Sequence, residues 1–169
     1  MSNKNNIVFI GFHGSGKSYV GKMYSIRNQM KWVDIDREIE KKYKARLIDV
    51  LNANGNERFC ELETEMILSM SGTHTVFSPG GSVIYNDEAM KHFSYTLDCT
   101  IVFLDTPYDV ICKRLGDWST RGIVVPPGNT LKTLYNQRWD LYKYYADIHV
   151  KETELNDILA RVSEEIEVL

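Results

Sequence analysis

The chain has 169 residues and a net charge of −3, with 43% hydrophobic and 25% charged residues. These fractions are near the average for globular proteins and argue against disordered, collagen-like and membrane classes. The length suits one α/β domain over residues 1–169 and is short for two. A slightly acidic chain lacks the broad basic face that nucleic-acid binding needs, so we expect no nucleic-acid partner.

The cysteines and the apolar segments predict a cytoplasmic protein. Cys60, Cys99 and Cys112 are widely spaced and form no CxxC pair, which argues against a disulfide framework or a zinc site. No run of 18 apolar residues exists, so we expect no membrane span, and only residues 1–6 precede the first apolar segment, which leaves no room for a targeting peptide. We expect a monomer with no membrane partner.

Short apolar segments alternate with helical patterns along the chain. Strands are predicted at residues 7–12, 32–35, 75–78, 100–105 and 147–150. Helices are predicted at 16–29, 36–53, 56–70, 86–93, 107–116, 129–145 and 153–168. This alternation predicts an α/β fold with a mainly parallel sheet covered on both faces, whose ligands bind beyond the carboxyl ends of the strands.

The strongest motif follows the first predicted strand. Residues 11–18 read GFHGSGKS and match GxxxxGK[ST], the phosphate-binding P-loop, in its required position between a strand and a helix. The glycines let backbone N–H groups point at phosphate oxygens, next to the positive end of the helix. Lys17 is placed to reach the β- and γ-phosphates of ATP, and Ser18 to hold Mg²⁺.

Two carboxylates follow the second predicted strand, in the sequence Val33-Asp34-Ile35-Asp36. Asp34 suits Mg²⁺, held through water, because Mg²⁺ keeps much of its hydration shell. Asp36 suits a hydrogen bond from an acceptor hydroxyl, which it orients or deprotonates. The alternative is that Asp36 only caps the next helix.

Two glycine-containing segments complete the pattern. Pro79-Gly80-Gly81-Ser82 follows the third predicted strand, and its glycine pair allows backbone amides to approach a ligand, although a plain turn fits as well. Residues 116–129, GDWSTRGIVVPPGN, contain three glycines and two adjacent prolines between two helices. This segment predicts a mobile lid.

These features, in this order, resemble the shikimate kinase family. The resemblance covers nearly the whole chain and also includes Gly55 with Phe59 and Glu63, the arginines Arg114 and Arg121, Arg138 with Tyr142, and the pair Ala146-Asp147. It implies a P-loop kinase fold with a five-stranded parallel sheet of order 2-3-1-4-5. It also implies a Mg²⁺-dependent transfer of the γ-phosphoryl group of ATP to a hydroxyl of a small acid, shikimate above all, giving shikimate 3-phosphate.

The resemblance also implies roles for single residues. Arg121 is similar to the lid arginine that stabilises the transferred group, Arg114 to the arginine that packs on adenine, and Arg138 to the arginine that grips the acceptor carboxylate. The expected catalytic residues are Lys17, Asp36 and Arg121. The expected ATP-binding residues are Gly14, Ser15, Gly16, Lys17, Ser18, Tyr19, Arg114 and Arg121. The expected substrate-binding residues are Asp36, Gly80, Gly81 and Arg138, and the expected metal ligands are Ser18 and Asp34.

One departure falls on the acceptor side. The family pattern has a second carboxylate-binding arginine directly after Phe59, and this chain has Cys60 there. A neutral thiol cannot replace a guanidinium. Arg58 is a candidate substitute, but two positions along a helix turn it about 200° around the axis, so it should face away.

Three functions therefore stay open: a shikimate kinase, a related kinase with a different small acceptor such as a gluconate-like sugar acid, and a nucleotide-binding homologue without turnover.

Overall fold

The computed structural model describes residues 5–169, apart from the side chain of Thr120. Five parallel strands form one sheet in the order β2-β3-β1-β4-β5, which confirms the predicted fold class and strand order. The strands are β1 Asn6–Ile10, β2 Lys31–Asp34, β3 Thr75–Ser78, β4 Cys99–Leu104 and β5 Ile148–Val150. Their bounds lie within two residues of those predicted.

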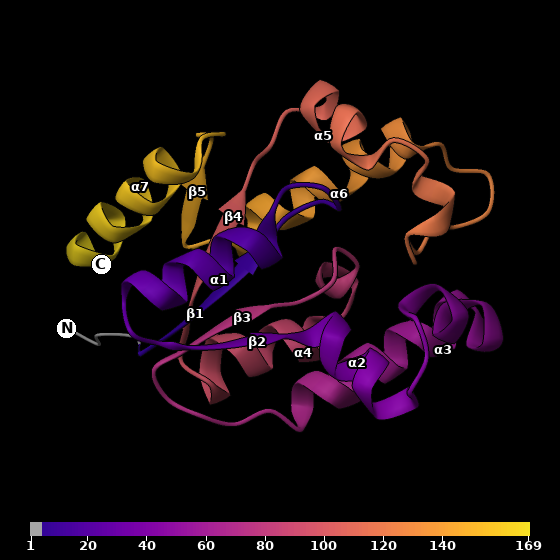
Figure 1. Ribbon diagram of the computed structural model, residues 1–169, viewed down its shortest axis with the longest axis horizontal. Coiled ribbons are helices and arrows are strands. Elements are labelled where there is room, and N and C mark those ends of the chain that lie inside the picture. Colours follow the sequence, from indigo (N-terminus) through magenta and orange to yellow (C-terminus); the bar gives the residue numbers. More distant parts are fainter. Residues whose placement is uncertain (1–4) are drawn as a thin grey trace.

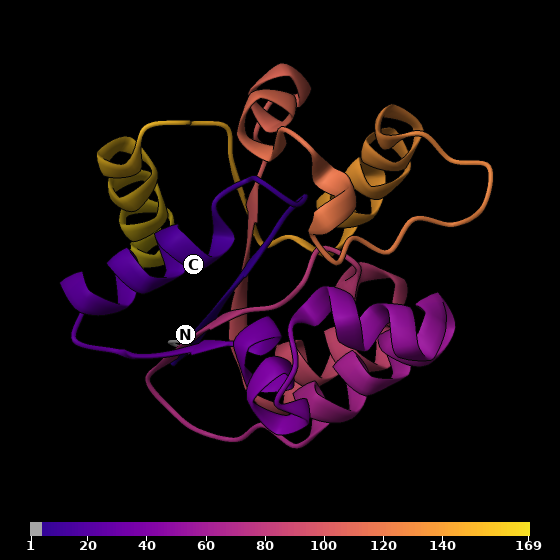
Figure 2. The same cartoon turned by 45° about the vertical axis from the view of Figure 1, so that its right-hand side comes forward.

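Helices cover both faces of the sheet (Figures 1 and 2). The α-helices are α1 Lys17–Arg27, α2 Ile35–Tyr43, α3 Leu47–Leu68, α4 Asp87–Lys91, α5 Tyr108–Leu115, α6 Leu131–Tyr145 and α7 Leu155–Val168. Shorter helical turns lie at η1 Val83–Tyr85, η2 His92–Thr96 and η3 Trp118–Thr120. None of the described helices is both long enough and apolar enough to cross a membrane.

Alternation along the central strands builds two apolar layers. Ile7 and Phe9 of β1 pack with α1 and α7, whereas Val8 and Ile10 pack on the opposite face with α2 to α6. All five residues of β1 and all six of β4 are buried. A parallel sheet covered on both faces requires such continuously apolar strands, and its rigid core fixes the positions of the loops that follow each strand.

The predicted helix boundaries between residues 36 and 70 were wrong. Helix α2 ends at Tyr43 because Lys44 has a left-handed backbone, with φ of 51°. Helix α3 begins at Leu47 and ends at Leu68. It continues through Gly55, where the sequence predicted a break between two helices. The predicted break at Gly55 survives only as a kink, with φ of 76° and ψ of 169°.

The kink predicts a specific sensitivity at Gly55. Its φ and ψ values fall in a region that is almost restricted to glycine, where a side chain costs about 1–3 kcal/mol. Nothing lies within 4 Å of a Cβ atom added at Gly55, so this cost is backbone strain and not a clash. We expect Gly55→Ala to lower the free energy of unfolding by about that amount in urea denaturation.

Asn52→Ala is the matched control, because Asn52 is exposed on the same helix at a position with regular helical backbone angles. It should be neutral or slightly stabilising, since alanine favours helix. Equal stability of Gly55→Ala and the wild type would show that the helix can straighten at this point.

Candidate active site

The P-loop connects β1 to α1 at the carboxyl edge of the sheet. Gly16 takes a left-handed backbone, with φ of 92°, immediately before α1 begins at Lys17. Lys17 is only 7% exposed, and its Nζ donates a hydrogen bond to the Phe12 carbonyl at 3.1 Å. Burial lowers the pKa of Lys17, while Asp36 opposes this effect. Lys17 is thus held within the loop that we expect to bind phosphate.

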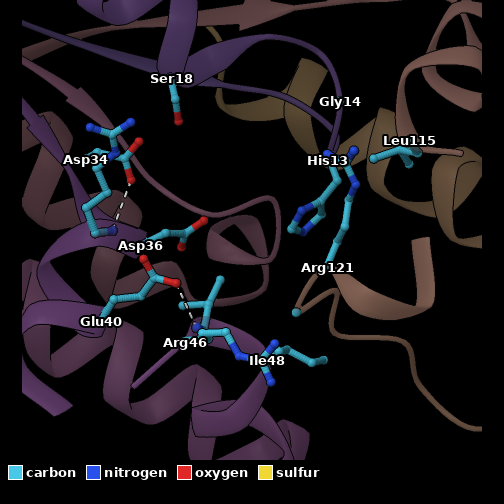
Figure 3. Close-up of a pocket in the computed structure, with 13 residues that line it drawn as sticks. His13, Gly14, Ser18, Asp34, Asp36, Glu40, Arg46, Ile48, Leu115 and Arg121 are labelled. Carbon is cyan, nitrogen blue, oxygen red and sulfur yellow. Dashed lines mark hydrogen bonds between the residues drawn. The ribbon is translucent and has the colours of Figure 1, made fainter. Parts of the chain in front are cut away.

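Asp34 and Asp36 have different surroundings, as the sequence analysis expected. Asp34 caps α2, since its Oδ1 accepts a hydrogen bond from the Arg37 N–H at 3.2 Å. The alternative role for Asp36 as the cap of this helix is therefore wrong. Asp36 lies in the first turn of α2 and points into a cavity (Figure 3). Burial, then Glu63 and Asp34, raise the pKa of Asp36.

This cavity, of about 460 Å³, brings together the two predicted metal ligands, one predicted acceptor-binding residue and the predicted lid arginine, but not Gly80, Gly81 or Arg138. Ser18, Asp34, Asp36 and Arg121 all line it. In Figure 3 the Asp36 carboxylate and the His13 ring face each other across it, and the Arg121 side chain extends toward Gly14. Its other lining residues, which sequence reasoning did not single out, are His13, Arg37, Glu40, Arg46, Leu47, Ile48, Leu115 and Gly122.

A second cavity, of about 500 Å³, lies on the other side of the P-loop. Its lining includes the predicted nucleotide residues Gly14, Ser15, Gly16, Tyr19, Arg114 and Arg121. Gly14 and Arg121 line both cavities. The two spaces therefore meet at the P-loop and at one lid arginine.

Four residues of the second cavity were missed: Thr153, Glu154, Leu155 and Ile158. They follow β5 and begin α7. The rule that ligands bind beyond the carboxyl ends of parallel strands was the signal that could have found them. The residues themselves match no motif.

Arg114 and Arg121 lie beside the P-loop, although both are exposed. The Arg114 Nη1 donates to the carbonyl of Gly14 at 3.1 Å, and the Arg121 Nη2 donates to the Arg114 carbonyl at 3.4 Å. Both guanidinium groups thus adjoin the cavity on the nucleotide side.

The glycine pair after β3 packs against two carboxyl groups. A Cβ atom on Gly80 would lie 2.5 Å from Glu63 Oε1 and 3.1 Å from Asp36 Oδ1, so a side chain at this position would force the Glu63 carboxyl group to move. The neighbouring Gly81 is fixed by the Tyr142 hydroxyl, which donates to its carbonyl at 2.5 Å. Both glycines are buried, with Gly80 beside Asp36 and Glu63, so the pair is no exposed surface turn.

Arg138 is fully buried and is not the surface arginine that a helical position often gives. Its Nη2 donates to the Val124 carbonyl at 2.5 Å and its Nε to the Tyr85 hydroxyl at 3.3 Å. Arg138 does not line the open cavity. It lies under the end of the predicted lid, where Ile123 and Val124 are buried.

Arg58 does not substitute for the arginine missing at position 60. Its Nη1 forms ion pairs with Glu61 Oε2 at 2.7 Å and Glu65 Oε1 at 2.9 Å, on the exposed side of α3. Cys60 is half-buried, and burial, with Glu63 next, raises the pKa of its thiol to about 11. Position 60 thus carries a neutral group at physiological pH.

Three buried side-chain atoms among the described residues lack a hydrogen-bond partner: Ser15 Oγ, Glu63 Oε1 and Arg138 Nη1. Native proteins leave few such atoms unpaired, and each needs an explanation. Ser15 belongs to the P-loop, while Glu63 and Arg138 lie at the acceptor side. The unpaired atoms thus gather where ligands are expected.

Known proteins with similar sequences and folds agree with this geometry. The family model of shikimate kinase matches residues 13–167. The chain belongs to the shikimate kinase family. It is 33% identical over 165 residues to the shikimate kinase of Persephonella marina, covering 93% of this chain and 98% of that protein.

Solved shikimate kinases share the fold. The Acinetobacter baumannii shikimate kinase, solved in complex with shikimate, superposes with a TM-score of 0.85 at 22% identity, covering 97% of this chain and 93% of that one. The Aquifex aeolicus shikimate kinase superposes with a TM-score of 0.77 at 29% identity, covering 96% of each chain. Family membership makes this chain an ATP-using phosphotransferase that acts on a hydroxyl group.

Proposed function

We propose that this shikimate kinase family member transfers the γ-phosphoryl group of ATP to a hydroxyl of shikimate, giving ADP and shikimate 3-phosphate. The observation that carries this proposal is the meeting of two cavities at Gly14 and Arg121. A nucleotide in one and an acceptor in the other would bring the γ-phosphate and the acceptor hydroxyl together at that junction. In-line transfer needs this arrangement.

The nucleotide-side roles follow from position and charge. Gly14, Ser15 and Gly16 offer backbone N–H groups to the phosphates, and the unpaired Ser15 hydroxyl adds a donor. Lys17 exchanges the Phe12 carbonyl for phosphate oxygens, where its positive charge is favoured. Tyr19 and Arg114 line the far part of this cavity, where the base would lie. Arg121 stabilises the charge that develops on the transferred group.

Ser18 and Asp34 would hold Mg²⁺. Both line the cavity beside the P-loop and offer oxygen ligands, the kind that Mg²⁺ prefers. One carboxylate, one hydroxyl, water and phosphate oxygens are the donor set of many phosphoryl-transfer sites. When bound, the ion would neutralise part of the negative charge of the phosphate groups.

Asp36 orients the acceptor. Its carboxylate accepts the hydrogen bond of the attacking hydroxyl and takes its proton as the oxygen–phosphorus bond forms and the bond to ADP breaks. Gly80 and Gly81 contribute close backbone contacts, and Arg138 contributes its unpaired Nη1 to the acceptor carboxylate.

Two alternatives concern the acceptor and turnover. A related small hydroxy acid, such as a gluconate-like sugar acid, is favoured over shikimate only by Cys60, which removes one expected carboxylate contact. A homologue without turnover is disfavoured, because Lys17, Ser18, Asp34, Asp36 and Arg121 are all retained around the junction.

The wider expectations complete the proposal. We infer a single-domain, monomeric, cytoplasmic enzyme without nucleic-acid or membrane partners. Residues 116–129 act as a lid that opens for exchange of ligands and closes during transfer.

Loss of the P-loop lysine should abolish turnover. We expect Lys17→Ala to reduce ADP release by at least about 10³-fold, because the γ-phosphate loses its nearest fixed cation. Release is measured in a coupled assay with shikimate, gluconate and other hydroxy acids. Lys22→Ala, an exposed lysine on the same helix, is the control and should keep wild-type turnover. Normal activity of Lys17→Ala would refute the P-loop role.

Loss of the Asp36 charge should separate turnover from nucleotide binding. Asp36→Asn should lower kcat by about 10²–10⁴-fold and leave ATP affinity within about 2-fold, since Asp36 contacts the acceptor and not the nucleotide. Glu38→Gln, on the same turn of α2, is the control. A parallel loss of ATP affinity would instead assign Asp36 to the metal.

The two arginines should differ sharply. Arg138→Ala should raise the KM for shikimate by about 10- to 100-fold, the factor expected for a lost charged hydrogen bond. Arg58→Ala should change it less than about 2-fold, because Arg58 forms only exposed ion pairs. Steady-state kinetics with saturating ATP checks both. A large effect of Arg58→Ala would mean that α3 rearranges when the acceptor binds.

A further inference from the structure

Glu63 is a buried carboxyl group without a paired cation. It is 2% exposed on α3, and within residues 5–169 no described side chain forms a salt bridge to it. Its Oε2 accepts the Ser82 hydroxyl at 2.8 Å, while its Oε1 has no hydrogen-bond partner. The Gly80 N–H lies near enough to favour the charged carboxylate without forming a hydrogen bond of acceptable geometry. An ionised carboxylate is costly to bury in such surroundings.

The neighbouring charges do not compensate this group. On its own helix the nearest group is the neutral thiol of Cys60. Lys17 of α1 and Arg138 of α6 favour the charged form of Glu63. Asp36 of α2 lies against the same glycine, and Glu63 raises the pKa of Asp36. Tyr142, also on α6, is a further titratable neighbour.

Arg138 forms no salt bridge with Glu63 in the described structure. Its Nη2 and Nε donate to Val124 and Tyr85, and Nη1 has no hydrogen-bond partner. The structure thus has one unpaired donor and one unpaired carboxyl oxygen at the acceptor side, both buried. A ligand that presents a carboxylate there meets the guanidinium of Arg138 and the Oε1 atom of Glu63.

We propose that Glu63 binds the carboxylate of the acceptor directly, as a neutral acid that donates a hydrogen bond from Oε1, and thereby replaces the arginine that Cys60 has displaced. This inference rests on the proposed function, since it concerns the same acceptor. Oε2 already accepts the Ser82 hydroxyl, so the proton belongs on Oε1. Once Glu63 is ionised, it repels an acceptor carboxylate.

The titration of Glu63 supports this assignment. Burial raises its pKa above the usual 4.5. For a carboxyl group that binds ligand in its protonated form, affinity is full below the pKa of the free protein and falls as pH rises through it. Well above that pKa, affinity falls about tenfold per pH unit, and each bound acceptor takes up one proton. An arginine at position 60 would pair with Glu63 and remove this dependence.

The test is calorimetric titration of the full-length protein with shikimate, without ATP or Mg²⁺, between about pH 6 and pH 9 in buffers of different ionisation enthalpy. The wild type should take up protons on binding and lose affinity as pH rises. Glu63→Gln mimics the neutral acid, since its amide can donate from the position of Oε1 while its oxygen accepts from Ser82. Its affinity should stay constant over this pH range, so it should bind shikimate more tightly than the wild type at the highest pH, where Glu63 of the wild type is ionised most.

Three further variants sharpen the result. Glu61→Gln removes an exposed carboxylate two residues away on the same helix and should reproduce the wild-type pH profile. Glu63→Leu removes the donor and should weaken binding about 10- to 100-fold even at pH 6. Cys60→Arg should abolish the proton uptake that depends on Glu63, because an ionised Glu63 then pairs with the new arginine. Thermal unfolding checks that each variant is folded.

Two outcomes would overturn the inference while leaving the proposed function intact. Either Glu63→Gln takes up as many protons as the wild type, or it binds as poorly at pH 6 as a variant without any polar group there. If the wild type turns over no shikimate and binds none, the proposed function fails, and this inference fails with it.

Discussion

The site depends on burying ionisable groups at one edge of the sheet. Lys17, Glu63 and Arg138 are each less than 8% exposed, and Asp36 lies beside them. Each buried polar atom without a partner costs about 1–3 kcal/mol, a large fraction of the stability of a domain. The apolar layers on both faces of the sheet must offset this cost. In return, donors and acceptors are fixed before ligands arrive, which is how a site stabilises transferred charge without reorganisation.

Local sequence patterns predicted the fold well where a single segment decides the structure. Strands buried on both faces read as short apolar runs, and the P-loop fixed the first βα unit. The predicted helix boundaries near residues 44 and 55 were wrong. Helix α2 is capped by Lys44, which has a left-handed backbone, and lysine does not usually signal the end of a helix. Conversely, Gly55 signalled a break that packing of α3 overrides, leaving only a kink.

The residues of the site fall into the same two groups: those that a local motif identifies, and those whose surroundings depend on long-range contacts. Motif residues such as Lys17 and Asp36 were accessible from sequence, since strand ends and loop chemistry place them. The surroundings of Arg138 and Glu63 were not, because they depend on contacts with Val124, Ser82 and other residues far away in sequence. The residues after β5 were missed although the rule for the carboxyl ends of parallel strands pointed to them, because they match no motif. The sequence thus identifies the ionisable side chains of the site, whereas burial and hydrogen bonding in the folded protein determine whether they are charged.

The lid and the acceptor side are joined through α3. The Asn56 side chain donates to the Val125 carbonyl at 3.0 Å, and Gly122 packs so closely on Leu47 that an added Cβ atom would lie 3.1 Å away. Both views show residues 116–129 beside α3 (Figures 1 and 2). Val124 accepts a hydrogen bond from Nη2 of Arg138, and Nη1 has no partner. In the proposed complex the acceptor carboxylate uses Nη1, so Arg138 would hold the predicted lid and the acceptor through different nitrogen atoms.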